Sequence, residues 1–328
     1  MPQEGVGEMM KMGFALVLLS LLVRQAWSED YPSRPVRVLV PSSPGGITDT
    51  AARIIGQRLA AVWGQPVVIE NRPGGGGTIG TAAAARATPD GYTLLATTNG
   101  EFALGPAINP NISYDPQADF KPIIMATFNP IILIANTSSP YNTIGDLIDA
   151  AKKKPGEITW ASPGVGTWND LAGEWFQSEA GIKLTHVPYR GGGPAATAVA
   201  AGDVPTGVLS ISSAEPFLQA GKVRVLAVMT KNRAKFDPSW PTLAESGVAN
   251  VDATNWVAFF GPAGIDPAVA KKAETDIRKV LRDPAVQKQF FALGIEPADM
   301  TTEELAAQIK SDRALSERIA KQANMTVQ

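Results

Sequence analysis

The sequence contains no cysteine and only one histidine, His186, among its 328 residues. The missing thiols exclude disulfides, thiolate metal sites, a cysteine nucleophile and a lipid anchor on an N-terminal cysteine. A single histidine disfavours a histidine-based metal site and leaves one imidazole as the base of a Ser-His-Asp type of site. We therefore expect neither a metal nor a cofactor.

The sequence also has no large excess of positive or negative charge. The 29 Lys and Arg residues nearly balance the 31 Asp and Glu residues, and the net charge is −2 at pH 7. Nucleic acids and anionic membrane surfaces bind basic patches, so we expect no nucleic-acid partner. A hydrophobic fraction of 45% and a charged fraction of 18% are typical of a globular protein, and the length suits two domains.

Only one long apolar run occurs, at residues 13–23, and it is too short for a comfortable transmembrane helix. Ala26 and Ser28 place small residues at positions −3 and −1 of a cleavage after Ser28. We interpret residues 1–28 as a cleaved signal peptide and expect the mature protein in the periplasm. Two early glutamates are unusual in such a segment, and an uncleaved N-terminal anchor is the alternative.

After this segment, short β-branched runs alternate with helical patterns. Residues 36–40 are almost continuously apolar, as in a parallel strand buried on both faces, and residues 47–62 repeat apolar side chains at helical spacing. The resulting βαβαβ order predicts a parallel sheet with right-handed crossovers. Further strands are expected at 66–69, 93–97, 123–126, 131–135, 158–161, 184–187, 206–209, 223–228 and 256–260. Further helices are expected at 78–86, 144–153, 168–180, 194–201, 267–281, 284–293 and 302–323.

The pattern breaks near residues 125–131 and again near residues 250–256. We interpret the breaks as two crossings between two doubly wound α/β lobes, with hinge closure around a ligand as the expected motion. The predicted division gives 29–127 and 256–300 to lobe 1, and 128–255 and 301–328 to lobe 2.

Three loops lie where strands of the predicted sheets end, which is where open α/β folds bind ligands. Two of these loops lead into helices, whose N-termini offer free N–H groups and the positive end of a dipole to a carboxylate. Two such ends facing each other would hold a dicarboxylate, although ordinary capped turns explain the same residue types. The candidate ligand-binding residues are Ser42, Ser43, Gly45, Gly46, Thr48, Asp49, Thr98, Asn99, Ser162, Gly166, Thr167 and Trp168.

A glycine run suggests a dinucleotide site, because Gly75, Gly77 and Gly80 satisfy G-x-G-x-x-G and Glu101 follows at a plausible distance. We reject this interpretation because the fingerprint belongs at the first βα turn and this is the second. Residues 71–73 also separate the glycines from the strand.

Three further residues each allow two interpretations. Asp49 either stabilises a helix N-terminus or organises the ligand loop. His186 is expected to be structural, since no G-x-S-x-G motif accompanies it. Arg190, before three glycines, either binds an anion or leads flexibly into the next helix.

Short motifs occur in a characteristic order along the mature chain. Residues 40–53 fit V-P-x-x-P-G-G-x-x-D-x-x-A-R, and this stretch is accompanied by YPSRP at 31–35, GQPVV at 64–68, ENRPG at 70–74, PDGYTL at 89–94, YDP at 114–116, LAGE at 171–174, HVPY at 186–189 and AGK at 220–222. Together they resemble the Bug family, the periplasmic binding proteins of tripartite tricarboxylate transporters.

The resemblance implies a Venus-flytrap fold that holds its ligand between the loops around 42–49 and 162–168. It implies recognition of a carboxylate by main-chain N–H groups and bridging waters, with Asp49 at the position of the family's Asp. It also implies a non-catalytic protein that delivers ligand to integral-membrane transporter subunits. We expect a monomer.

Three departures from the family pattern lie at the predicted cleft. Ser42-Ser43 replaces Phe-Pro, Trp168-Asn169-Asp170 replaces S-P-H, and Leu209-Ser210 replaces an Asp-Asn pair. The missing acid disfavours an amino-acid ligand, and Trp168 offers a flat apolar face. We therefore hypothesise an aromatic or apolar-bodied carboxylate.

Two other classes of function stay open at this point. One is a periplasmic sensor module for a signalling partner, which would use the same capture step. The other is an exported hydrolase that pairs Ser42, Ser43 or Ser162 with His186.

Overall fold

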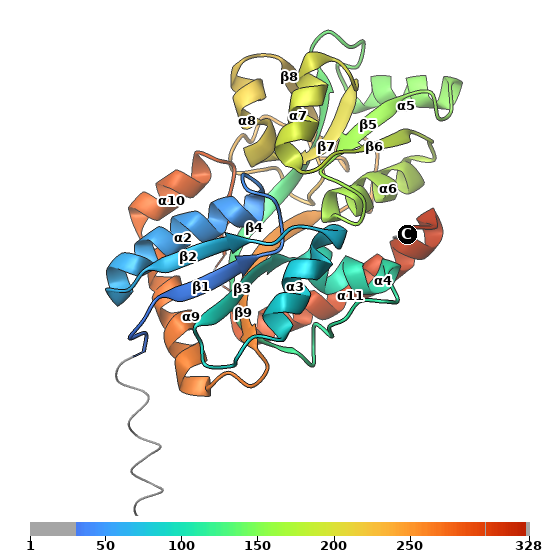
Figure 1. Cartoon of the computed structure of the whole chain (residues 1–328). Helices are drawn as coiled ribbons and strands as arrows, with labels where there is room; N and C mark the ends of the chain where they lie inside the picture. The colour runs from blue at the N-terminus through green and yellow to red at the C-terminus, as the bar shows by residue number, and fades with distance from the viewer. Residues whose placement is uncertain (1–30, 299, 326–328) are drawn as a thin grey trace, which may run out of the picture.

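The computed structural model describes residues 31–298 and 300–325, so the predicted signal peptide lies outside the described residues. Figure 1 shows two α/β lobes that share one long strand, β4 (Phe120–Asn136). The strands of both lobes form a continuous sheet in the order β2-β1-β3-β9-β4-β7-β5-β6, with β10 and β8 also paired to β4. Among the described residues, no helix is long and apolar enough to cross a membrane.

Lobe 1 is built on three parallel strands, to which two antiparallel strands are added. Strand β1 pairs in parallel with β2 and β3, whereas β9 runs antiparallel to both β3 and β4. Its strands are β1 (Val36–Val40), β2 (Val67–Asn71), β3 (Thr93–Thr98), β9 (Thr254–Pro262) and β10 (Glu296–Pro297).

Helices cover both faces of this sheet. Val38 and Val40 belong to one buried cluster and Leu39 to another, because successive side chains of a strand point to opposite faces. Each fully buried aliphatic side chain of this kind contributes about 1.5–3 kcal/mol. The helical segments of this part of the chain are α2 (Ile47–Trp63), η1 (Gly75–Gly77), α3 (Thr78–Ala85), η2 (Gly100–Leu104), α4 (Gly105–Ile108), α9 (Pro267–Leu281) and α10 (Pro284–Phe291).

Lobe 2 repeats this plan on the second half of β4. The neighbouring side chains Trp160 and Ala161 belong to clusters on opposite faces of its sheet. Its elements are α5 (Ile144–Lys153), β5 (Thr159–Ser162), α6 (Trp168–Ala180), β6 (Thr185–Pro188), α7 (Gly192–Ala201), β7 (Thr206–Ser210), α8 (Ile211–Gln219) and β8 (Val223–Val228). The α/β architecture expected from the sequence is confirmed, with the correction that the sheet is mixed rather than purely parallel in both lobes.

Strand β4 corrects one sequence-based expectation. Two strands were expected with Asn129-Pro130 between them, but the structure has one strand of 17 residues. Its pairing with β9 continues to Pro130, and its pairing with β7 begins at Ile131. Proline removes one backbone donor, and here that loss falls where the strand changes partners. The chain returns between lobes at Ala253, whose N–H still bonds Met229 just before β9 begins.

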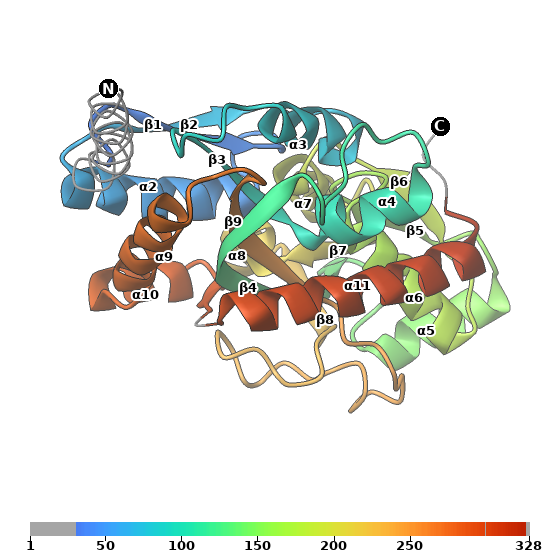
Figure 2. The ribbon, with the colours of Figure 1, turned by 90° about the horizontal axis from the view of Figure 1, so that it is seen from below.

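The C-terminal helix α11 (Thr302–Ala323) spans both lobes rather than belonging to lobe 2. Leu305 and Ile309 pack into a lobe 1 cluster, whereas Ile319 and Ala320 pack into a lobe 2 cluster. Figure 2 shows the helix running along the molecule from β4 toward α6. Two short segments, η2–α4 and α8, have no counterpart among the expected helices.

Candidate functional site

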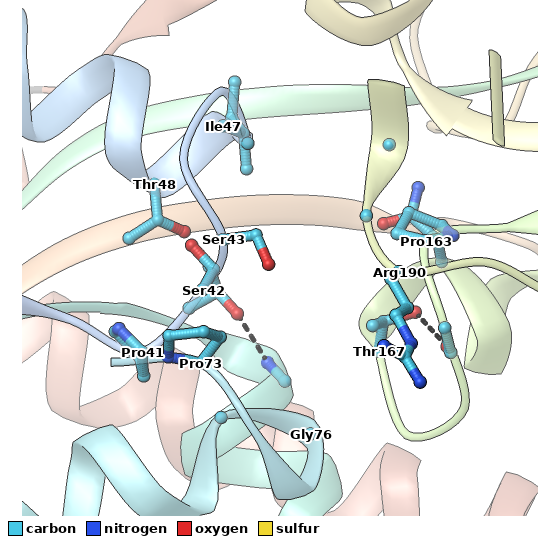
Figure 3. A pocket seen from close by; sticks show the side chains of 18 of the residues that line it. Pro41, Ser42, Ser43, Ile47, Thr48, Pro73, Gly76, Pro163, Thr167 and Arg190 are labelled. Atoms are coloured by element: carbon cyan, nitrogen blue, oxygen red, sulfur yellow. Dashed lines mark hydrogen bonds between the residues drawn. The ribbon is translucent and has the colours of Figure 1, made fainter. Parts of the chain in front are cut away.

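A cavity of about 680 Å³ lies between the loops of the two lobes. In Figure 3 Ser42, Ser43 and Thr48 extend from lobe 1, and Pro163, Thr167 and Arg190 from lobe 2. The loop that precedes α2, the glycine run before α3, the start of η2, the loop that precedes α6 and the turn into α7 all contribute to its lining.

The lobe 1 loop is held in place by Asp49, in the first turn of α2. One carboxylate oxygen accepts the Gly45 N–H at 2.9 Å, and the other accepts from Asn71 Nδ2 at 3.0 Å and from Arg53 at 2.8 Å. Gly45 has φ +82°, a conformation that favours glycine. Burial opposes ionisation, but the hydrogen bonds from Arg53, Gly45 and Asn71 lower the pKa of Asp49 below its ordinary value.

The lobe 2 loop is held by a matching carboxylate, Asp170, in the first turn of α6. Its Oδ2 accepts the Gly166 N–H at 2.9 Å, again from four residues back and again from a glycine with positive φ. Its Oδ1 lies 3.3 Å from His186 Nδ1, and His186 Nε2 lies 2.6 Å from Ser162 Oγ. Ser162 Oγ in turn accepts the Gly164 N–H at 3.1 Å, so the chain of contacts fixes the loop at two points.

Burial controls the protonation of this chain of contacts. It raises the pKa of Asp170 to about 7 and lowers the pKa of His186 to about 4. His186 also stacks on Trp160, with ring centroids 4.2 Å apart. When Asp170 is ionised, the contacts fit a neutral imidazole that carries its proton on Nδ1, donates to Asp170 and accepts from the Ser162 hydroxyl.

A second buried carboxylate, Glu101, lines the cavity from lobe 1. Its Oε2 accepts from Thr97 Oγ1 at 3.0 Å, from the Thr98 N–H at 3.0 Å and from Thr98 Oγ1 at 2.6 Å. Burial raises its pKa above the ordinary value. On the lobe 2 side Arg190 is exposed and makes no ion pair or side-chain hydrogen bond with another described residue. Glu101 and Arg190 are the only charged residues among the described residues that line the cavity.

Most of the predicted ligand-binding residues do line this cavity. Nine of the twelve are brought together there, namely Ser42, Ser43, Gly45, Gly46, Thr48, Thr98, Gly166, Thr167 and Trp168. Asp49, Asn99 and Ser162 are not among the lining residues, and Asp49 and Ser162 instead support the loops.

The predicted ligand-binding roles of Asn99 and of the Trp168 side chain are wrong. Asn99 is fully buried and donates to the Thr254 carbonyl at 3.0 Å, on the side of Asp312 rather than of the cavity. The Trp168 side chain lies in the lobe 2 core and the residue is only 2% exposed. It therefore does not present the open flat face on which the hypothesis of an aromatic ligand rested.

Several lining residues were not among the predicted ligand-binding residues. Arg190 was an open alternative as an anion-binding residue, and it does line the cavity. Glu101 and Asn255 were not expected in the site, and Asn255 Oδ1 is buried without a hydrogen-bond partner among the described residues. The glycine run also lines the cavity, so its role here concerns space and backbone conformation rather than a dinucleotide. An isolated Glu in the apolar stretch around residue 101 was the one signal in the sequence that could have indicated a buried, special carboxylate. Among the described residues, no group of three or more acidic or histidine side chains could hold a metal ion.

Comparison with known proteins agrees with this geometry. The family model of tripartite tricarboxylate transporter family receptors matches residues 51–325. BugT of Bordetella pertussis is 34% identical over 278 residues, which cover 84% of this chain and 85% of BugT. The structure of R. palustris Rpa4515 with adipate superposes with a TM-score of 0.87 at 31% identity, over 90% of this chain and 99% of that chain. MatC of Rhodopseudomonas palustris with bound malate gives a TM-score of 0.82 at 28% identity, over 88% and 99% of the two chains. The chain thus belongs to the family of tripartite tricarboxylate transporter receptors, the solute-binding proteins that include BugT.

Proposed function

We propose that this protein captures a small carboxylate in the cleft between its lobes, in the periplasm, and delivers it to membrane subunits of a transporter. The observation that carries the proposal is the cavity itself. It lies at the N-termini of α2 and α6, and it is lined by Arg190, which makes no ion pair with another described residue. The free N–H groups of two helix ends and a guanidinium together form a site for an anion. The adipate and malate held by the two structural relatives support a carboxylate as this anion.

The lining residues also define what the site does with its ligand. Most of them are glycines, prolines and small hydroxyl residues, so the ligand is held mainly by main-chain groups. Loops from both lobes contribute, so the ligand is enclosed fully only when the lobes are close together. A receptor that hands over its ligand needs such a reversible enclosure.

The experiment is a thermal-shift and calorimetric screen of the purified mature protein with adipate, malate and related carboxylates. A ligand that binds only the folded state raises the apparent melting temperature. Arg190→Gln should weaken binding about tenfold or more, since hydrogen bonds to charged groups contribute about 1.5–3 kcal/mol. Lys152→Gln, on the exposed face of α5, is the matched control and should leave binding unchanged. Failure of every carboxylate to bind the folded parent would refute the proposal.

The Ser162–His186–Asp170 contacts resemble a catalytic triad but do not support hydrolysis. Ser162 is fully buried, and its hydroxyl is engaged by Gly164 and His186. A nucleophile has to reach the substrate, and this one does not line the cavity. The family is one of solute receptors, and we interpret the three residues as support for the lobe 2 loop.

A further inference from the structure

Glu101 lines the ligand cavity, and the hydrogen bonds from neighbouring residues all go to one of its two carboxylate oxygens. The residue is 7% exposed, and Oε2 accepts all three hydrogen bonds from Thr97 and Thr98. No other described residue donates to Oε1. The Tyr114 hydroxyl fixes the backbone of Glu101 by donating to its carbonyl at 2.7 Å. These hydrogen bonds fix the orientation of the Glu101 carboxylate before any ligand binds.

The glycine run is shaped around this carboxylate. A Cβ added at Gly77 would overlap the Glu101 side chain, coming within 2.6 Å of Cγ, and its nearest neighbour would be Oε1. Gly77 also has φ +92°, which side-chain-bearing residues rarely adopt. The absence of a side chain at this position leaves room for Oε1 beside the cavity, since Gly77 and Glu101 both line it. The glycine run, which does not bind a dinucleotide in our interpretation, thus makes space for the Glu101 carboxylate.

The two charges of the cavity come from opposite lobes. Arg190 belongs to lobe 2 and Glu101 to lobe 1, and the described lining residues include no other charged group. Because both residues line the same cavity, a ligand that spans the cleft can place a carboxylate at Arg190 and another polar group at Glu101. Burial raises the pKa of Glu101 because it disfavours the ionised form. A hydrogen-bond donor on the ligand would stabilise the ionised carboxylate, whereas a second carboxylate nearby would destabilise it further.

We propose that Glu101 is a specificity-determining residue, and that the ligand is a carboxylate carrying a hydroxyl or ammonium group that donates to Glu101 Oε1. This inference rests on the proposed function and narrows its ligand class. An amino-acid ligand is included in this class. The acid that is missing at Leu209-Ser210 in lobe 2 has a substitute in Glu101, which lines the cavity from lobe 1.

The test uses matched triads of carboxylates, such as succinate, malate and aspartate, which differ only in carrying no donor, a hydroxyl or an ammonium group. Triads of different chain length are titrated into the mature protein by calorimetry. In at least one triad a substituted member should bind the parent about tenfold or more tightly than the unsubstituted member. The hydroxyl and ammonium arms show which donor the site prefers.

Variants then assign this preference to Glu101. Glu101→Gln should remove most of the difference within the triad, and Thr97→Val, which removes one donor to Oε2, should reduce it. Arg190→Gln should weaken all members by the same factor, because it contacts the carboxylate that they share. Glu157→Gln, on the exposed surface, is the matched control.

The outcomes separate this inference from the proposed function. If no carboxylate binds the folded parent, the proposed function fails. If carboxylates bind but the unsubstituted members bind the parent as tightly as their partners in every triad, only the inference fails, and this result does not depend on how any variant folds. A preference that persists in a folded Glu101→Gln variant also overturns it.

Discussion

The Asp170–His186 pair predicts pH dependences of opposite sign in two single variants. In the unfolded chain, between about pH 4.5 and about pH 6, the histidine is protonated and the aspartate ionised, because their ordinary pKa values are 6.5 and 3.8. In the folded protein Asp170 holds the proton, since its pKa is about 7, and His186, with a pKa of about 4, is neutral. The pair therefore binds one proton in both the folded and the unfolded state. In the parent it does not change how the free energy of unfolding depends on pH in this range.

Asp170→Asn leaves only the histidine. Its folded pKa is lower than its unfolded pKa, so its stabilising contribution is present above about pH 6.5 and is lost as the pH falls toward 4. His186→Gln leaves only the aspartate, whose folded pKa is raised. Its contribution is present below about pH 3.8 and is lost as the pH rises toward 7.

One proton of difference corresponds to about 1.4 kcal/mol per pH unit. Relative to the parent, the free energy of unfolding should therefore rise by about 2 kcal/mol from about pH 4.5 to about pH 6 in Asp170→Asn. It should fall by about the same amount in His186→Gln. Urea denaturation followed by tryptophan fluorescence, at a series of pH values, measures these changes in the free energy of unfolding.

The double variant Asp170→Asn/His186→Gln is the internal control. Its free energy of unfolding should depend on pH as that of the parent does. All other titrating groups are shared, so they cancel in the differences. The assignment of one proton to this buried pair would be refuted if the free energy of unfolding, relative to the parent, changed with pH in the same direction in both single variants. It would also be refuted if neither single variant differed from the parent in its pH dependence.

Two further predictions concern the carboxylate that holds the lobe 1 loop and the buried Trp168 side chain. Asp49→Asn keeps the shape but removes the charge that holds the Gly45 N–H, so affinity for any carboxylate that binds the parent should fall about tenfold, as measured by calorimetry. An unchanged affinity would show that the loop keeps its shape without the charge. Trp168→Phe should lower the free energy of unfolding by about 1–3 kcal/mol, since the side chain is buried. The same variant should change the binding of aromatic and aliphatic carboxylates by equal factors, and a selective loss for aromatic acids would contradict its assignment to the core.

The elements that the sequence predicted best are those whose ends are set locally. The expected helix at 144–153 matches α5, where Thr143 and Asp146 form a capping box, and the expected helix at 267–281 matches α9, which Asp266 caps. Strand β4 was divided in two because Pro130 is ordinarily a break. Its continuity depends on pairing with Thr254, which is remote in the sequence. Tertiary pairing overrides local preference there.

The site shows the same limit. Loops that end strands could be placed in a cleft by rules about α/β sheets, and most of their residues do line it. The direction of a side chain could not be predicted in this way. Asn99 faces Asp312, more than two hundred residues later, and Trp168 turns into the core of its own lobe. Glu101 and Arg190 come to line one cavity only when the two lobes are placed together.

The two lobes use one device with two different partners. In each, an Asp in the first turn of a helix accepts the N–H of a positive-φ glycine four residues earlier. Asp49 is paired with Arg53, which stays charged at any accessible pH, so the lobe 1 loop is held by an ionised carboxylate from mildly acidic pH upward. Asp170 faces a neutral imidazole, so burial prevails and its carboxylate gains a proton near neutral pH. A charged acceptor binds an N–H more strongly than a neutral one, and the lobe 2 loop is therefore the one that weakens as the pH falls below 7. Of the two carboxylates that hold the loops, the one that titrates near neutral pH is therefore Asp170, in lobe 2.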